Sequence, residues 1–425
     1  MTSFSIQSFG CRVNQAEAFE WADEIQTKGY RYEKDHTKSD VILVNTCTVT
    51  SRADRDVRGF LRKIHRENPK ARLLLTGCYV ERSPDRFKTH PQLWRIVPNS
   101  EKNTLSGLMN PLPQPKDKGP HQSYRSRALV KIQDGCDFRC TFCIVPSVRG
   151  RSISIDRKKI IDRVTDYVNR GFDEIVLTGV HLCLYGRGQD RMPSLVDLIL
   201  ELEGIEGLGR IRLSSLDPRF LTDDSIEHLT TSSKICPHFH FSLQSGCDGI
   251  LRKMGRTIRT TDYSRILGIF HRTMPHAALG ADVLVGFPEE SASDFEETLK
   301  FLRESPLTYL HVFTYSPRPG TKAAVLTQVR HREKTRRTRI LRALSRETNF
   351  AFRQRFLGKE TEAVVIKKLG RGTQVLTSNF IHVRVPHCPV ENKKRVSVKI
   401  TKVFETYTEG HVCEGLSDPS HERVL

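Results

Sequence analysis

The sequence predicts an α/β protein built from three parts. These are an N-terminal domain with a parallel sheet, a central open or partial barrel of six βα units, and a small C-terminal β-barrel. Short apolar β-branched runs alternate with helical patterns over roughly the first 110 residues, and again over residues 128–316, which is typical of parallel sheets. A polar segment with four prolines separates these two regions, and the tail changes to short alternating strands.

The N-terminal domain, residues 1–110, has predicted strands at 4–8, 41–45 and 72–76, with helices between them. Each strand is followed at once by a cysteine, namely Cys11, Cys47 or Cys78. Successive parallel strands end at the same edge of a sheet, so these cysteines are expected to converge there. A single cysteine is more often a small buried hydrophobe. Three at equivalent strand ends indicate a common site instead.

The proline-rich linker covers residues 111–127, and the central domain covers 128–356. Strand patterns at 129–133, 174–177, 210–213, 238–243, 280–285 and 309–314 form the six units, and the chemistry of such barrels lies at the C-terminal ends of the strands. A basic helical stretch follows from about residue 330 to 356. Residues 357–418 are expected to form the small β-barrel, a fold that often binds RNA.

Composition and charge narrow the class of protein. The 425 residues carry a formal net charge of +19, which favours a polyanionic partner such as nucleic acid. There is no apolar run long enough to span a membrane and no basic–apolar leader, so the expected location is the cytoplasm. In that compartment, the 11 cysteines are better suited to metal binding or catalysis than to disulfides.

A compact cysteine loop follows the first strand of the central domain. Cys136, Cys140 and Cys143 have the spacing C-x3-C-x2-C, and three thiolates this close can hold three irons of a cubane cluster. No fourth cysteine stands in the loop, although Cys183 could reach it, so one iron would stay open for catalysis. Zinc is the competing metal, but the spacing matches no familiar zinc finger.

This loop, with Phe142 before its last cysteine, resembles the radical S-adenosylmethionine superfamily. Further stretches extend the resemblance along nearly the whole chain to the methylthiotransferase family. They are G-C-R-V-N-Q (10–15), N-T-C-T-V-T (45–50), T-G-C (76–78), I-V-P (144–146), R-G-R (149–151), L-T-G-V-H (177–181), R-L-S-S-L-D-P (212–218), H-F-H-F-S-L-Q-S-G (238–246), D-V-L-V-G-F-P (282–288) with Glu290, and Y-S-P-R-P-G-T (315–321). One departure is Asp217, where the family more often has Glu.

The resemblance implies two [4Fe-4S] clusters and S-adenosylmethionine as cofactors. Cys136, Cys140 and Cys143 would hold the radical-generating cluster, and Cys11, Cys47 and Cys78 an auxiliary cluster that carries the sulfur to be donated. Thr178 and Gly179 correspond to a segment that receives the methionine end of the cofactor. Weaker cofactor or substrate candidates are Ser215, Gln244 and Asp282, for which hydrogen bonds that only tie the barrel together are nearly as good an explanation.

The resemblance also suggests a substrate. Residues 11–15 and 45–54 are most similar to the branch that methylthiolates N6-threonylcarbamoyladenosine next to the tRNA anticodon. Such an enzyme also implies a flavodoxin- or ferredoxin-type electron donor, a sulfur donor and a C-terminal TRAM domain for RNA. The alternatives are isopentenyladenosine in tRNA, an aspartate of a ribosomal protein, and a non-enzymatic iron–sulfur scaffold that binds RNA.

Overall fold

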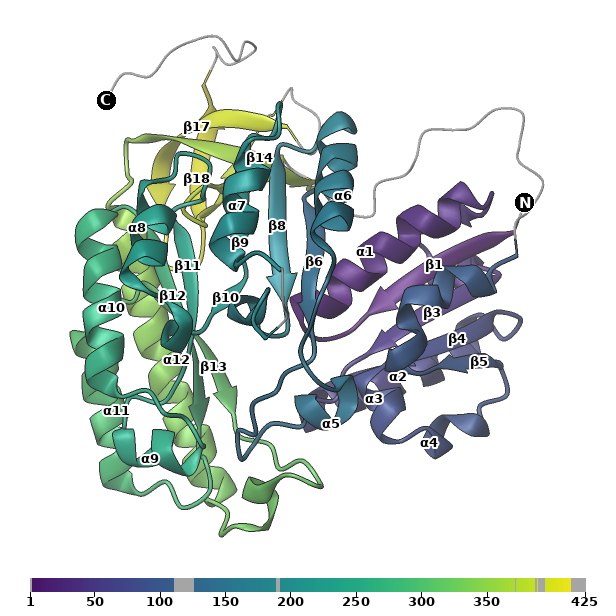
Figure 1. Ribbon diagram of the computed structural model, residues 1–425, viewed down its shortest axis with the longest axis horizontal. Helices are drawn as coiled ribbons and strands as arrows, with labels where there is room; N and C mark the ends of the chain where they lie inside the picture. The colour runs from purple at the N-terminus through teal and green to yellow at the C-terminus, as the bar shows by residue number, and fades with distance from the viewer. Residues whose placement is uncertain are drawn as a thin grey trace.

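A computed structural model describes residues 2–110, 126–188, 192–370, 372–386, 388 and 394–413. The N-terminal domain is a parallel five-stranded sheet in the order β2-β1-β3-β4-β5 (Figure 1). Its strands are β1 (Ser3–Ser8), β2 (Arg31–Tyr32), β3 (Val41–Thr46), β4 (Arg72–Gly77) and β5 (Leu93–Val97). The three predicted strands are confirmed, and the edge strands β2 and β5 were not predicted.

The helices of this domain are α1 (Arg12–Thr27), α2 (Ser51–Glu67), α3 (Cys78–Arg82) and α4 (Asp85–Lys88). Helix α1 lies between the N-terminal sheet and the central domain (Figure 1). Phe19 belongs to the core of the central domain, and Ala16 packs with Leu129 and Val176. Because α1 contributes apolar side chains to both cores, the two domains share one continuous packed interface.

The central region contains two four-stranded sheets, ordered β7-β6-β8-β9 and β10-β11-β12-β13. All six predicted strands are present as β6 (Ala128–Asp134), β8 (Glu174–Gly179), β9 (Arg210–Leu213), β11 (His238–Gln244), β12 (Ala278–Val285) and β13 (Tyr309–Thr314), with the short β7 (Ile153–Ser154) and β10 (Ser215–Leu216) in addition. The helices are α5 (Val145–Arg149), α6 (Arg157–Asn169), α7 (Leu195–Glu203), α8 (Asp223–Thr231), α9 (Asp248–Lys253), α10 (Thr260–Thr273), α11 (Ala292–Glu304) and α12 (His331–Gln354). In Figure 1 the parallel strands of the central region run down the picture, and the N-terminal domain lies to their right.

The C-terminal part is a closed barrel in the order β14-β15-β16-β18-β17. Its strands are β14 (Glu360–Lys368), β15 (Thr373–Thr377), β16 (His382–Val385), β17 (Arg395–Val403) and β18 (Thr408–Val412). The sequence predicts strands at 361–367, 374–377, 382–385 and 395–404, which correspond to β14, β15, β16 and β17, and it does not predict β18. Most of the predicted linker, residues 111–125, lies outside the described residues.

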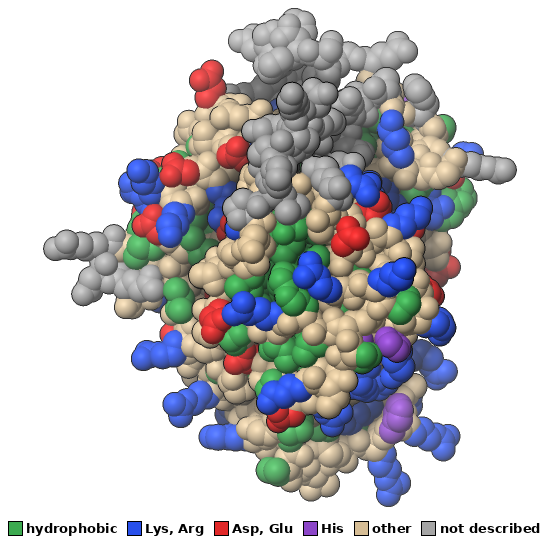
Figure 2. All heavy atoms as spheres, turned by 90° about the vertical axis from the view of Figure 1, so that its right-hand side faces the viewer, with side chains coloured by type: hydrophobic (Ala, Val, Ile, Leu, Met, Phe, Trp, Pro, Cys, Tyr) green, Lys and Arg blue, Asp and Glu red, His purple; other side chains and the backbone are tan. Residues whose placement is uncertain are grey.

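Basic side chains gather on the face formed by the N-terminal domain. Figure 2 shows Lys and Arg predominating over acidic groups on the lower part of this face. Helix α2 alone carries the exposed residues Arg52, Arg55, Arg62, Lys63 and Arg66. Within the part of the chain that the structure describes, no helix has the length and apolar character needed to cross a membrane.

Candidate active site between two cysteine triplets

The N-terminal cysteines occupy the ends of three adjacent strands, as predicted. Cys11 caps the start of α1, Cys47 follows β3, and Cys78 opens α3 directly after β4. Gly10 has φ +88°, and a Cβ there would lie 2.4 Å from the Sγ atom of Cys47. Any other residue at position 10 would therefore push Cys11 and Cys47 apart.

Asn14 and Thr46 tie these loops together. The Asn14 amide donates to the carbonyls of Phe9 (2.9 Å) and Thr46 (3.0 Å), and the Thr46 hydroxyl donates to the carbonyl of Thr76 (2.7 Å). The bonds to the Thr46 and Thr76 carbonyls cross from one strand end to the next, so the three cysteine-bearing loops form one unit. The asparagine of the G-C-R-V-N motif thus has a structural reason for its position.

The second triplet lies in the loop after β6. The Cys136 amide donates to the Gly150 carbonyl at 3.1 Å, and the Thr141 amide donates to the Met254 carbonyl at 3.0 Å. Gly135 has φ +69°, and a Cβ there would lie 1.9 Å from the carbonyl oxygen of Arg151. The loop therefore folds back against the R-G-R motif, so the backbone of that motif supports the second triplet.

The two triplets face one another across the domain interface. Cys78 is buried against Ile144 and Val148, which directly follow the second triplet. A cavity of about 240 Å³ is lined by Cys143 of the second triplet and by Thr50 from the loop after Cys47, whereas the three N-terminal cysteines lie outside its wall. Gln244 and Asp282 also line this cavity, so the structure brings three predicted site residues together there.

Thr178, Gly179 and Ser215 do not line the cavity. Thr178 and Ser215 stand at the end of β8 and on β10, and their buried hydroxyls have no hydrogen-bond partner in the protein. A Cβ on Gly179 would lie 2.9 Å from the side-chain oxygen of Gln133. Unpartnered buried hydroxyls are uncommon, so each of these two retains an unused capacity for a hydrogen bond at its strand end.

Asp282 is held by two histidines on neighbouring strands. Its Oδ1 atom lies 2.8 Å from Nε2 of His240 on β11 and 3.5 Å from Nδ1 of His311 on β13. Burial alone would raise the pKa of Asp282, but the two imidazoles hold it well below its usual range. Gln244 adopts φ 74°, a strained conformation for a residue other than glycine that is often found at functional sites.

Asp217, the residue that departs from the family pattern, lies in an ion cluster. It is 3% exposed and contacts Arg219 at 2.7 Å, Arg256 at 3.0 Å and His181 at 3.1 Å. Arg219 in turn lies 4.4 Å from the centre of the Phe138 ring, inside the cysteine loop. Asp217 thus orients the cation that packs on this loop, and its oxygens are already occupied by protein groups.

The donor sets fit iron–sulfur clusters better than single ions. Neither cysteine triplet brings its three Sγ atoms within 4.8 Å of one another, whereas His240, Asp282 and His311 do bring their donor atoms that close. A single zinc ion needs such convergence, but a cubane cluster binds each thiolate at a different iron. Cys183 is buried in the central core and accepts from the Asp217 amide at 3.4 Å, so its thiol is engaged elsewhere.

Burial keeps the thiols of Cys47 and Cys143 protonated. It raises the pKa of Cys47 and of Cys143 to about 12 in each case, with neighbouring cysteines adding to the shift. Thiolates are the form that binds metal, so cluster insertion must displace these protons.

A buried charged network separates the two triplets, and the sequence reasoning assigned it no role. Glu17, Lys102, Lys131 and Arg149 have side chains no more than 6% exposed, and the more exposed Asp134 completes the network. Burial alone would raise the pKa of Glu17, but Arg149, Lys102 and Lys131 hold it well below its usual range. The R-G-R motif was the one sequence signal that pointed to this network.

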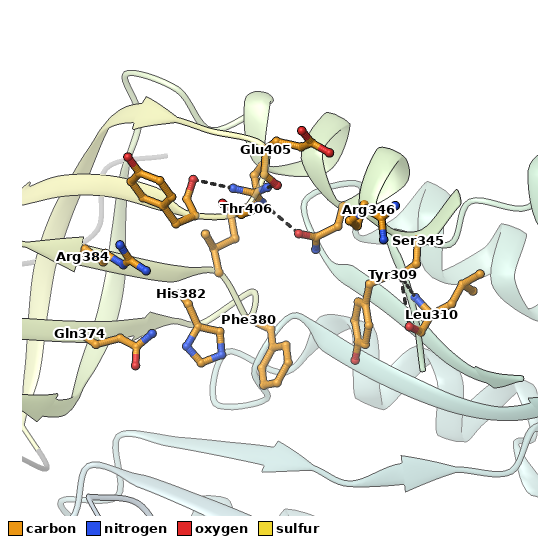
Figure 3. A pocket seen from close by; sticks show the side chains of 14 residues that line it. Tyr309, Leu310, Ser345, Arg346, Gln374, Phe380, His382, Arg384, Glu405 and Thr406 are labelled. Atoms are coloured by element: carbon orange, nitrogen blue, oxygen red, sulfur yellow. Dashed lines mark hydrogen bonds between the residues drawn. The ribbon is translucent and has the colours of Figure 1, made fainter. Parts of the chain in front are cut away.

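A second pocket, of about 450 Å³, lies between the C-terminal barrel and the central domain (Figure 3). Arg346 from α12 and Arg384 from β16 line it, together with Tyr407. The Arg384 guanidinium lies 4.5 Å from the centre of the Tyr407 ring. Cationic groups beside an aromatic face are a common means of binding nucleic acid.

Protein-family models and a solved structure show which class of enzyme the protein belongs to. Residues 130–302 match the model of the Radical SAM superfamily, and residues 3–97 match Uncharacterized protein family UPF0004. The fold resembles the radical S-adenosylmethionine methyltransferase TsrM of Kitasatospora setae, with a TM-score of 0.56 and 13% identity over 76% of this chain and 77% of that one. The protein is therefore a radical S-adenosylmethionine enzyme, which implies S-adenosylmethionine and a [4Fe-4S] cluster.

Relatives that match this chain over most of their length identify the family within that class. The chain is 34% identical to a threonylcarbamoyladenosine tRNA methylthiotransferase of Aquifex aeolicus, over 89% of this chain and 96% of the relative. It is 31% identical to an enzyme of the same name from Bacillus subtilis, over 100% and 99%. A tRNA-2-methylthio-N(6)-dimethylallyladenosine synthase of Lachnoclostridium phytofermentans is also 31% identical, over 97% and 96%. The chain belongs to the radical S-adenosylmethionine methylthiotransferase family.

Proposed function

We propose that the protein converts N6-threonylcarbamoyladenosine next to the anticodon of tRNA into its 2-methylthio derivative. The full-length relatives with that name support this substrate. The observation that carries the chemistry is that two cysteine triplets from two domains meet at one interface, where Cys78 packs against Ile144 and Cys143 lines a cavity.

Each triplet would hold one [4Fe-4S] cluster. Cys136, Cys140 and Cys143 would hold the cluster that cleaves S-adenosylmethionine, and Cys11, Cys47 and Cys78 an auxiliary cluster. Bound cofactors would supply a radical able to activate a strong C–H bond and the sulfur that replaces its hydrogen. The protein's part is to hold both centres at one domain interface, because proximity replaces a rare encounter by an effectively unimolecular step.

Other residues around the cavity would bind and orient the reactants. Asp282 presents a carboxylate fixed by His240 and His311, which suits hydroxyl or amine groups of the cofactor or substrate. The unpartnered hydroxyls of Thr178 and Ser215 would form hydrogen bonds with the polar end of the cofactor, as donors or as acceptors. Apolar side chains such as Phe142 and Leu284 line the same cavity and keep water from it.

Each of the three domains would have a separate role. Residues 1–110 would carry the auxiliary cluster and 128–356 the radical chemistry, while the barrel, residues 357–418, would act as a TRAM domain that binds tRNA. A flavodoxin- or ferredoxin-type donor would supply electrons and a separate donor the sulfur. We expect the reaction in the cytoplasm, where tRNA would meet both donors.

Nucleoside mass spectrometry tests the proposal. The protein is expressed in a strain that lacks the modification, and its digested tRNA is expected to contain 2-methylthio-N6-threonylcarbamoyladenosine. Cys47→Ala should abolish this product while leaving some cleavage of S-adenosylmethionine. Methylthio-isopentenyladenosine, or a methylthio-aspartate in a ribosomal protein with tRNA unchanged, would place the chain in another branch of the family.

A further inference from the structure

Arg149 connects the two cysteine triplets. It ends helix α5, and the carbonyl of the next residue, Gly150, accepts the Cys136 amide at 3.1 Å. Its side chain is 2% exposed, and its Nε atom lies 3.3 Å from the Sγ atom of Cys78. One residue therefore has its backbone beside the second triplet and its guanidinium on Cys78 of the N-terminal triplet.

The remaining donors of Arg149 fix the plane of the guanidinium. Nη1 donates to Glu17 at 3.1 Å and to Asp134 at 2.7 Å, and Nη2 donates to Glu17 at 3.3 Å and to Asn14. These acceptors come from α1 and from the end of β6, on opposite sides of the domain interface. A lysine has a single ammonium group in place of the planar guanidinium. It could not donate hydrogen bonds to Cys78 and to both carboxylates at the same time.

The network around Arg149 carries an excess of positive charge. Arg149, Lys102 and Lys131 are three cations, whereas Glu17 and Asp134 are two carboxylates. An uncompensated buried charge is costly. The excess cation is directed at a cysteine, and a thiolate there would supply the missing negative charge.

We propose that Arg149 is a positioning residue that sets the reduction potential of the N-terminal cluster by donating a charged hydrogen bond to the Cys78 thiolate. The inference rests on the proposed function, because it requires the N-terminal cluster. Hydrogen bonds to the sulfurs of a cluster favour its reduced, more negative form and raise its potential. The guanidinium contacts Cys78 of the N-terminal triplet, so its effect falls on the N-terminal cluster.

The test uses full-length protein with Cys136, Cys140 and Cys143 changed to Ala, so that only the N-terminal cluster remains. Its midpoint potential is measured by a redox titration followed by electron paramagnetic resonance. Arg149→Lys should shift the one-electron reduction equilibrium about tenfold toward the oxidised form, roughly 59 mV. Asp134→Asn should shift it the other way, because it removes an anion that neutralises Arg149. Arg151→Gln, a matched control with a side chain 92% exposed in the native chain, should leave it unchanged.

The outcomes separate the two proposals. Absence of iron in the parent with the three alanines would refute the N-terminal cluster itself. An unchanged potential in Arg149→Lys at full iron content would overturn the role of Arg149, as would equal shifts in Arg149→Lys and Asp134→Asn. Loss of iron in Arg149→Lys alone would also overturn it, since the residue would then be a structural support.

Discussion

The Nε2 atom of His240 lies 2.8 Å from the Oδ1 atom of Asp282, which joins two neighbouring strands at the wall of the cavity. A carboxylate only accepts, so Nε2 carries the proton and Nδ1 accepts from the Tyr309 hydroxyl at 3.0 Å. Nε2 of His238 then donates to the same hydroxyl at 2.8 Å, and its Nδ1 has no partner. Burial lowers the pKa of both histidines, and with both rings neutral these bonds form one continuous chain from His238 to Asp282.

Asp282→Asn should weaken S-adenosylmethionine binding. The substitution keeps the shape of the side chain but removes the charge that a cofactor hydroxyl or amine would meet. A hydrogen bond to a charged group contributes about 1.5–3 kcal/mol, so the dissociation constant should rise about tenfold or more. Equilibrium binding to reconstituted protein measures this, with iron content unchanged. Asp223→Asn, on the exposed surface of α8, is the control, and equal affinities in both variants would remove Asp282 from the cofactor site.

Acid should destabilise the protein through the buried histidines. Burial lowers the pKa of His238 well below its usual range and also lowers that of His240, so the unfolded chain binds these protons first as the pH falls. The stability is fully present above about pH 6.5 and is lost below it, by up to about 1.4 kcal/mol per histidine and pH unit. Urea unfolding at pH 7.5 and 5.5 measures the loss. His238→Asn should reduce the pH dependence, whereas His271→Gln, an exposed histidine, should not; equal slopes would contradict the mechanism.

The strand ends that carry chemistry were predictable, because the same local pattern recurs there. An apolar run followed by a small residue and a cysteine occurs three times, and the parallel sheet brings these ends together. The edge strand β5, L-W-R-I-V, is apolar enough to have been predicted, whereas β2 has only two residues and β18 is a polar strand with Gly410 at its centre. Local patterning carries no signal for strands such as β2 and β18, since neighbouring strands supply their pairing.

The buried charged network could not be predicted from the sequence. Glu17 meets Lys102, Lys131 and Arg149 across 85, 114 and 132 positions, and nothing near Glu17 marks it as buried. An amphipathic helix such as α1 normally presents its charges to solvent. Only the packing of α1 between two domains reverses that expectation.

Removing the second triplet should leave the N-terminal iron in place. Reconstituted wild-type protein should bind roughly eight irons, and the variant with Cys136, Cys140 and Cys143 changed to Ala about half. The two donor sets come from different domains with their own backbone hydrogen bonds, so one can be lost without the other. Iron analysis with circular dichroism measures this, and Cys388→Ala, a buried thiol of the barrel, is the control. Complete loss of iron in a folded variant would contradict independent sites.

Asp217→Asn should lower the free energy of unfolding of the central domain. Any loss of S-adenosylmethionine cleavage should follow from that instability rather than from a direct role of Asp217 in the reaction. The substitution would leave Arg219 and Arg256 facing a neutral amide in a buried site, which costs about 3–5 kcal/mol. Asp217→Glu keeps the charge and should retain most of the stability. Denaturant unfolding measures the difference, and S-adenosylmethionine cleavage by the Glu variant gives the second readout. A stable Asn variant that cannot cleave the cofactor would instead make Asp217 part of the reaction.

The C-terminal barrel cannot simply be deleted to test RNA binding. Arg210 and Arg212 of β9 donate to barrel carbonyls, at 3.2 Å to Leu376 and 3.1 Å to Thr377. A truncation would leave these buried guanidiniums partly unpaired and would unfold part of the central sheet. Point substitutions in the pocket of Figure 3 avoid this difficulty.

Replacing Arg346 and Arg384 by Ala should weaken tRNA binding and flatten its dependence on salt. Both line the pocket from exposed positions, so their loss removes two cations without opening the core. If each contacts one phosphate, the slope of log affinity against log salt should fall by about 1.4–1.8, because fewer counterions are released. Filter binding between 50 and 200 mM salt measures the slope, and cleavage of S-adenosylmethionine without tRNA should be unaffected. Arg265→Ala, exposed on α10 and paired with Asp223, is the control. An unchanged slope in the double variant would mean that tRNA docks elsewhere, and the basic face of α2 would then be the surface to substitute next.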